Sequence, residues 1–255
     1  MSAEIYQFLC LEDNYGVLLH NPQGGVTATI DVPDADAALK ALQTTGWQLT
    51  HIFCTHHHVD HTAGIRELKK ATGCTVYAPR AEQSKIPEVD IGLADGDTID
   101  FGGMTVEVFA TPGHTLGHIV YYVPSEKLLF AADTLFPLGC GRVFEGTMEG
   151  MWNSLQKLMR LPSDTVVYWG HEYTASNARF ALTIEPGNQA LQDRAREVER
   201  LRSEGKPTVP TTIGVELATN PFLRASSPEI RERLNMLEES DAAVFGEIRR
   251  RKDRF

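Results

Sequence analysis

The chain has 255 residues, of which 42% are hydrophobic and 23% are charged, and its formal net charge is −10. That length suits one large domain, or a large domain followed by a small one, with enough apolar residues for a substantial core. The negative charge argues against nucleic acid and anionic membrane surfaces as partners.

The sequence carries no sign of export or membrane insertion. No run approaches the roughly 18 consecutive apolar residues of a membrane span, and the first residues, MSAEIYQFLC, lack the basic start of a secretory signal. The four cysteines, Cys10, Cys54, Cys74 and Cys140, are scattered without CxxC spacing, which is typical of reduced thiols in structural positions. We therefore expect a cytoplasmic protein.

Strand and helix patterns alternate over the first two thirds of the chain. In chain order, the patterns predict strands at 16–20, 26–32, 47–55, 74–79, 104–111, 118–123, 127–133 and 165–170, with helices at 34–46 and 62–73. The first helix follows Pro33 and stops at Gly46, and its apolar face combines Ala35, Leu39 and Leu42. This alternation is typical of an α/β domain.

Strand signals stop after about residue 173, and three helical patterns follow. They cover 191–205, 227–239 and 241–255, and the second begins with Ser227 as N-cap and Pro228 at the first helical position. The apolar faces of the last two helices consist of Ile230, Leu234 and Leu237, and of Val244, Phe245 and Ile248. We expect an α/β domain over residues 1–172 and a small helical domain over residues 173–255.

The densest chemical signal is THHHVDH, at residues 55–61, where four histidines and an aspartate occur within seven residues. Histidine and carboxylate are common ligands of zinc and related divalent ions. His56 and His58 are two residues apart, so in an extended segment they point to the same side, whereas His57 points elsewhere and is left out. Asp60 and His61 follow where the chain turns toward a helix, which suits a second metal beside the first.

Three isolated residues can complete these sites. His114 lies in a Pro-Gly turn, Asp133 ends the run LLFAAD, and His171 follows VVYWG. Each follows an apolar strand, and in α/β sheets binding sites assemble at the carboxyl ends of strands. The candidate metal ligands are therefore His56, His58, Asp60, His61, His114, Asp133 and His171. A carboxylate such as Asp133 could bridge two ions.

Each candidate ligand, taken alone, also has an explanation that involves no metal. A single histidine such as His114 or His171 is more often a hydrogen-bonded core or loop residue, and an aspartate after a strand is usually a turn residue. A closed structural zinc site is a further alternative, but such sites typically include cysteine among four ligands. Seven candidates without a cysteine favour an open catalytic site, and His20, His51 and His118 are left outside it.

These motifs resemble a known family. The segments THHHVDH, TPGHT, FAADTLF and GHEYT, with DNYG, CGRVFEGT, NPFLR and RRRKDRF, are similar to those of the metallo-β-lactamase superfamily, and within it to glyoxalase II, the hydroxyacylglutathione hydrolase family. The resemblance covers nearly the whole chain. It implies an αββα metallo-β-lactamase sandwich over residues 1–172, followed by a small C-terminal helical domain over 173–255 that contributes to glutathione binding.

The resemblance also assigns roles to residues. It implies that His56, His58 and His114 hold one metal, that Asp60, His61 and His171 hold the second, and that Asp133 bridges them. Substrate-binding positions would be Arg142, Val143, Phe144, His171, Glu172, Tyr173, Arg249 and Lys252. Many relatives carry lysine and tyrosine where this chain has Arg142 and Phe144, so the charge is kept but one hydroxyl is lost.

The implied activity is hydrolysis of the thioester of S-D-lactoylglutathione and related S-2-hydroxyacylglutathiones, the second step of methylglyoxal detoxification. A hydroxide held by two divalent metals would attack the carbonyl, with Asp60 and Asp133 as the catalytic carboxylates. The expected metal is Zn²⁺, with iron or manganese as alternatives, because histidine and carboxylate suit all three. The expected partner is this small substrate, with neither nucleic acid nor membrane, and we expect a monomer.

The basic end of the chain supports the same substrate from the residues alone. Arg249 and Lys252 are three residues apart, hence on one helical face, in an otherwise acidic protein. Glutathione conjugates carry two carboxylates, which a local basic patch can bind. A solvated or frayed basic terminus is the alternative explanation.

Other functions on the same scaffold remain alternatives. A mononuclear-iron glutathione persulfide dioxygenase would need fewer ligands and usually lacks the long helical appendage. A β-lactamase is disfavoured because no cysteine takes a ligand position and no export signal is present. A nuclease is disfavoured by the net charge of −10. A non-catalytic metal-binding module is allowed by the ligand inventory and would hold a metal ligated entirely by protein.

Overall fold

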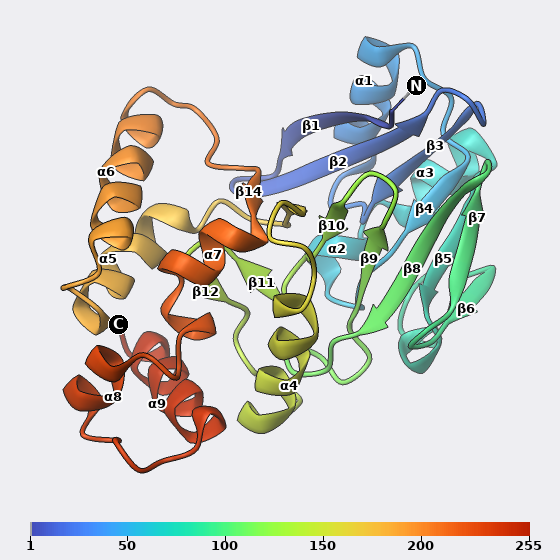
Figure 1. Cartoon of the computed structure of the whole chain (residues 1–255). Helices are drawn as coiled ribbons and strands as arrows, with labels where there is room; N and C mark the ends of the chain where they lie inside the picture. The colour runs from blue at the N-terminus through green and yellow to red at the C-terminus, as the bar shows by residue number, and fades with distance from the viewer. Residues whose placement is uncertain (1) are drawn as a thin grey trace.

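The computed structural model describes residues 2–255 and contains two facing six-stranded sheets with helices outside both (Figure 1). The first sheet has the order β1 (Glu4–Cys10), β2 (Asn14–Asn21), β3 (Val26–Ile30), β4 (His51–Phe53), β5 (Thr75–Pro79) and β6 (Ile91–Leu93). The second has the order β14 (Thr211–Thr212), β13 (Val166–Tyr168), β10 (Leu128–Phe130), β9 (Ile119–Val123), β8 (Met104–Ala110) and β7 (Thr98–Phe101). This arrangement confirms the predicted α/β sandwich.

The helices complete the outer layers. They are α1 (Ala35–Thr45), α2 (Val59–Thr62), α3 (Ile65–Thr72), α4 (Met148–Met159), α5 (Thr174–Ile184), α6 (Gln189–Ser203), α7 (Ile213–Thr219), α8 (Pro228–Leu234) and α9 (Asp241–Asp253). Short pieces are the 3₁₀ turns η1 (Arg80–Glu82) and η2 (Pro221–Leu223), and the hairpin β11 (Leu135–Phe136) and β12 (Gly139–Cys140). In Figure 1 the helices after β13 gather on one side of the second sheet. No helix within residues 2–255 is long and apolar enough to cross a membrane.

The core lies in three layers, which explains why so many strands are apolar on both faces. Between the sheets, Phe53 and Leu19 pack with Phe101, Tyr121 and Phe130. A second cluster joins the outer face of the first sheet to α1 and α3, and a third joins the second sheet to α4, α5, α7 and α9. All four cysteines are buried and free, as their spacing predicted.

Helix α1 shows how local sequence sets an element's ends. The Asp34 carboxylate accepts a hydrogen bond from the Ala37 N–H at the start, and Gly46 adopts the left-handed conformation at the end. Pro33 therefore precedes the cap, and the helix begins two residues later. The predicted face is confirmed for Ala35 and Leu42, although Leu39 is only partly buried.

Two predicted elements are shorter than the patterns suggested. The strand expected at 47–55 is only His51–Phe53, because the chain leaves the sheet to form the histidine-rich loop. The helix expected at 62–73 is two helices, α2 and α3, interrupted at Gly64. Gly64 approaches the turn before α1 so closely that an added Cβ would lie 2.6 Å from the backbone nitrogen of Ala35.

The end of the chain differs from the prediction in three respects. Two helices, α5 and α7, were not predicted from the sequence patterns. Strands do not stop at residue 173, because Thr211–Thr212 pairs antiparallel with β13 at the edge of the second sheet. Helix α8 ends at Leu234, where Asn235 turns left-handed, so Leu237 lies beyond the helix and is 60% exposed. Val244, Phe245 and Ile248 are fully buried, as predicted.

Residues on both sides of the predicted boundary at 172/173 share one core. Trp152 of α4 packs against Phe245 of α9, with ring centroids 5.7 Å apart. Phe222 contacts both Phe180 and Phe245. The helical part of the chain therefore packs directly on the sandwich.

Candidate metal centre and adjoining pocket

The seven predicted ligands come together at one edge of the sandwich. His56 and His58 follow β4, Asp60 and His61 lie in α2, and His114 lies in the loop between β8 and β9. Asp133 follows β10, and His171 follows β13. Strand ends from both sheets thus deliver the donors, as the positions after apolar strands predicted.

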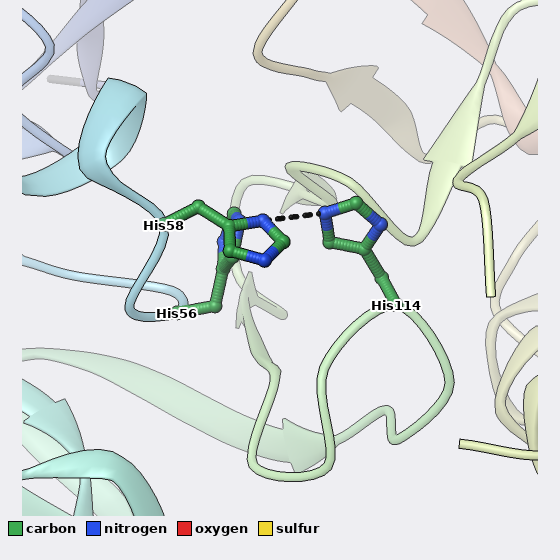
Figure 2. A group of neighbouring side chains, drawn as sticks. All are labelled: His56, His58 and His114. Atoms are coloured by element: carbon green, nitrogen blue, oxygen red, sulfur yellow. Dashed lines mark hydrogen bonds between the residues drawn. The ribbon is translucent and has the colours of Figure 1, made fainter. Parts of the chain in front are cut away.

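The first cluster consists of three histidines whose ring nitrogens converge (Figure 2). His58 Nδ1 lies 3.1 Å from His56 Nε2 and 3.0 Å from His114 Nε2. A neutral imidazole has one nitrogen with a free lone pair, and here one nitrogen from each of three rings faces the same point. This donor set suits a divalent cation.

The second cluster consists of Asp60, His61 and His171. The Nε2 atoms of the two histidines are 3.3 Å apart, and Asp60 Oδ2 lies 3.8 Å from His61 Nε2 and 3.4 Å from His171 Nε2. Asp60 is the most exposed of the three, with 41% of its side chain accessible. Its carboxylate therefore faces the opening of the site.

Asp133 lies between the two clusters. Its Oδ2 is 3.3 Å from His114 Nε2, and its Oδ1 is 3.4 Å from His61 Nε2 and 3.6 Å from His171 Nε2. Within residues 2–255, the buried Oδ1 accepts no well-formed hydrogen bond. A buried carboxylate oxygen without such a partner is costly, and a shared cation would satisfy it.

The pKa shifts follow from burial and from these neighbours. Burial, aided by the nearby histidines, holds the pKa of His56 well below its ordinary value, and the pKa of His58 is lowered for the same reasons. Burial also lowers the pKa of His61, but the carboxylates of Asp133 and Asp31 outweigh it, so the net pKa is well above the ordinary value. Burial alone would raise the pKa of Asp133, yet His61 and the other histidines hold it below its usual range.

The outer ring nitrogens are held by partners that include two carboxylates, Asp31 and Asp13, which the sequence patterns did not single out. Asp31 Oδ2 accepts a hydrogen bond from His61 Nδ1 at 2.8 Å, and His171 Nδ1 lies 3.2 Å from Asp13 Oδ1. His114 Nδ1 donates to the carbonyl of Arg142 at 2.8 Å. Each contact orients its ring so that the inner Nε2 faces the site. Asp31 follows the run VTATI, the same post-strand position that singled out Asp133.

His57 points away from both clusters, as predicted, and meets a buried acid. Its Nδ1 lies 2.9 Å from Glu82 Oε2 and its Nε2 lies 3.5 Å from Glu145 Oε1. Glu82 also accepts the backbone N–H groups of His57 and Gly117, both at 2.8 Å. Glu82 therefore ties the loop carrying His56 and His58 to the loop carrying His114.

A pocket of about 450 Å³ opens beside the donors. Its walls include the predicted substrate residues Arg142, Phe144, His171, Tyr173, Arg249 and Lys252, together with His58, Asp60, His114 and Asp133. The structure does not bring Val143 and Glu172 to this wall. Val143 packs against the core, and the Glu172 carboxylate accepts from Tyr15 Oη at 2.6 Å and from the Thr208 N–H at 3.0 Å.

The pocket has one cationic end and one aromatic side. Lys252 Nζ donates to Ser176 Oγ at 3.1 Å, and burial, reinforced by Arg249 and Arg179, lowers its pKa to about 8. Phe144 is 59% exposed and sets its ring against His58 and His114, with centroids 5.8 and 5.3 Å away. The pocket thus brings together convergent histidine and aspartate side chains, cationic groups and apolar surface.

Comparison with known proteins gives a family match for each of the two parts of the chain. Residues 24–171 match the family model described as the metallo-beta-lactamase superfamily, and residues 172–255 match hydroxyacylglutathione hydrolase C-terminus. A protein named hydroxyacylglutathione hydrolase from Rhizobium meliloti (strain 1021) is 57% identical over 254 residues, covering 100% of this chain and 99% of that protein. One of the same name from Rhizobium etli is 56% identical over 252 residues, covering 99% and 98%.

Solved structures share the fold at lower identity. The crystal structure of ETHE1 from Myxococcus xanthus has a TM-score of 0.67 at 24% identity, covering 95% of this chain and 94% of that one. The structure of TTHA1623 in a di-iron-bound form has a TM-score of 0.64 at 25% identity, covering 86% of this chain and 100% of that one. At 24% identity, the similarity to ETHE1 shows a shared fold only.

Proposed function

The chain belongs to the hydroxyacylglutathione hydrolases of the metallo-beta-lactamase superfamily, and we propose that it hydrolyses S-D-lactoylglutathione to glutathione and D-lactate. It is therefore a thioester hydrolase. The observation that carries the choice of substrate is the pocket, which joins the donor clusters to Arg142, Arg249 and Lys252. A thioester placed at the donors leaves a peptide whose carboxylates can reach these cations.

We further propose which residues hold metal. Superfamily membership implies a divalent ion, and the converging nitrogens and the buried Asp133 Oδ1 fit one. Two ions would be held, one by His56, His58 and His114 and the other by Asp60, His61 and His171, with Asp133 between them. Zinc suits these donors, and so do iron and manganese. When bound, such ions supply a water that ionises near neutral pH and offset negative charge on the carbonyl oxygen.

The protein groups around the donors position the reactants. Asp60 Oδ2 is exposed to the pocket and can accept a hydrogen bond from the attacking water, which orients it toward the thioester. Phe144 sets its ring against His58 and His114 and gives that side of the site an apolar surface. The leaving group is a thiol with a pKa of about 8.5 for an ordinary cysteine, so it departs as thiolate without a strong acid.

We also propose a division of labour along the chain. Residues 1–172 carry all seven donors, and residues 173–255 supply Tyr173, Arg249 and Lys252 to the pocket wall. The helical part would then select the glutathione moiety, while the sandwich carries out the chemistry. The mononuclear-iron dioxygenase is not favoured, because the donors form two clusters and the dioxygenase would need only one.

The test is steady-state hydrolysis of S-D-lactoylglutathione beside a simple thioester without glutathione, each before and after chelation. We expect fast turnover that is selective for the glutathione substrate, lost on chelation and restored by added metal. Absence of turnover with metal bound would reject the proposal, and oxygen uptake with glutathione persulfide would then be measured.

A further inference from the structure

An acidic residue pairs with two arginines that line the cationic end of the pocket. Asp253, the last residue of α9, places its Oδ1 2.9 Å from Arg249 Nη2 and 3.1 Å from Arg249 Nε. The same oxygen lies 3.2 Å from Nε of Arg142, which comes from the loop after β12. One carboxylate oxygen therefore joins two arginines that are 107 positions apart in the sequence.

The two arginines differ in how firmly they are held without Asp253. The Arg249 side chain is 6% exposed, donates from Nη1 to the Cys140 carbonyl at 2.8 Å, and lies 5.1 Å from the Phe222 ring centroid. The Arg142 side chain is 53% exposed and packs over Phe144 at 5.7 Å. Among the residues the structure describes, Asp253 is the one carboxylate that pairs with Arg142.

We propose that Asp253 is a positioning residue that holds Arg142 and Arg249 together as a site for a carboxylate of the glutathione moiety. Without it, an exposed arginine would lose conformational freedom on binding substrate, and that cost would weaken binding. Asp253 also offsets repulsion among Arg142, Arg249 and Lys252, and the wall still keeps an excess of positive charge. The inference rests on the proposed function, because it concerns recognition of glutathione.

A different role for Asp253 would reverse the sign of its effect. If its carboxylate occupied the place of the substrate's carboxylate, it would compete with substrate, and removing its charge would tighten binding. If it served only the fold, its loss would affect every substrate equally. Asp253 contacts Arg249 on its own helix and Arg142 on a separate loop, and it does not itself line the pocket, which favours the positioning role.

The test is Asp253→Asn in the full chain, measured on S-D-lactoylglutathione and on a simple thioester. Loss of a charge-assisted pair is expected to raise KM for the glutathione substrate about tenfold, with kcat and the simple thioester unchanged within about twofold. The dissociation constant of glutathione itself, measured by calorimetry, should rise by a similar factor. Asp253→Glu, which keeps the charge, should recover part of the affinity.

Glu247→Gln is the matched control. Glu247 lies on the same helix and also pairs with two arginines, Arg250 at 3.2 Å and Arg251 at 3.0 Å, but none of the three lines the pocket. Its loss should leave KM and the glutathione dissociation constant unchanged. An unchanged or lower KM in Asp253→Asn, or equal losses on both thioesters, would overturn the inference. If the wild type does not turn over the substrate, the proposed function fails, and glutathione binding still tests Asp253.

Discussion

The sharpest structural prediction concerns Glu82, whose carboxylate joins two metal-donor loops. The residue is 3% exposed, and its two oxygens accept the N–H groups of His57 and Gly117, each at 2.8 Å. In Glu82→Gln an amide nitrogen replaces one oxygen. That nitrogen cannot accept, so one buried backbone N–H loses its partner and faces another donor.

The magnitude follows from these contacts. A buried donor left unpaired costs about 1–3 kcal/mol, and hydrogen bonds to charged groups contribute about 1.5–3 kcal/mol, so we expect a loss of about 3 kcal/mol. For a chain of this length, that loss lowers the thermal midpoint by about 6–12 °C. His56 and His58 lie on one of the two loops that Glu82 joins, and His114 lies on the other. Loss of this link should lower the affinity for metal about 10–100-fold.

The assay combines thermal unfolding of the metal-free protein with competition against a chelator for bound metal. Glu145→Gln is the comparison, because Glu145 accepts the Leu116 N–H at 3.0 Å but is 27% exposed, so water can replace its carboxylate. We expect its loss to cost less than about 1 kcal/mol. Unchanged stability and metal affinity in Glu82→Gln would refute the reasoning.

Three further outcomes test the site. Asp133→Ala is expected to abolish binuclear metal binding and activity together, and full activity with one metal per chain, measured by elemental analysis, would contradict it. Lys252 has a pKa lowered to about 8 by burial, Arg249 and Arg179, so it is charged below that pH and neutral above it. KM for S-D-lactoylglutathione should therefore rise as pH passes about 8, and Lys252→Arg should remove that rise. Phe144→Tyr adds a hydroxyl at the exposed ring and should lower KM roughly 2–10-fold, the effect of one hydrogen bond; a higher KM would show that the hydroxyl finds no partner.

The donor residues could be placed from the sequence because their signal is local. Two histidines at i and i+2 share a side in an extended segment, and polar residues after parallel strands lie at one edge of their sheet; here such edges of the two facing sheets meet. Those rules sufficed to bring Asp133 and His171 beside THHHVDH. Neither rule requires the order of the strands in the sheets to be known.

The supporting residues could not be found in the same way. Glu82 contacts His57 and Gly117 only because three separate loops converge, and the sequence contains no pattern that links them. Asp253 sits in a run of basic residues that equally suits a solvated terminus. Strand β14 has two residues, too few for any periodic signal. In each case the deciding contact is long-range, so only the folded chain reveals it.

The segment that follows Asp133 shows why the two halves of the chain are difficult to separate. Residues 135–140 are buried, so their backbone groups need partners, and the helical part provides them. Asn220 Nδ2 donates to the carbonyls of Phe136 and Gly139 at 3.1 and 2.9 Å, and Glu216 Oε2 accepts the Leu138 N–H at 2.8 Å.

Arg249 adds a fourth contact, to the Cys140 carbonyl at 2.8 Å. The same segment leads directly into Arg142, whose carbonyl accepts from Nδ1 of the proposed metal ligand His114. One short buried segment therefore links contacts of the C-terminal helices both to Arg142 in the pocket wall and to His114 in the first cluster. If the proposed assignments hold, substrate recognition and metal binding share this support, and a helical residue outside both donor clusters would influence metal affinity.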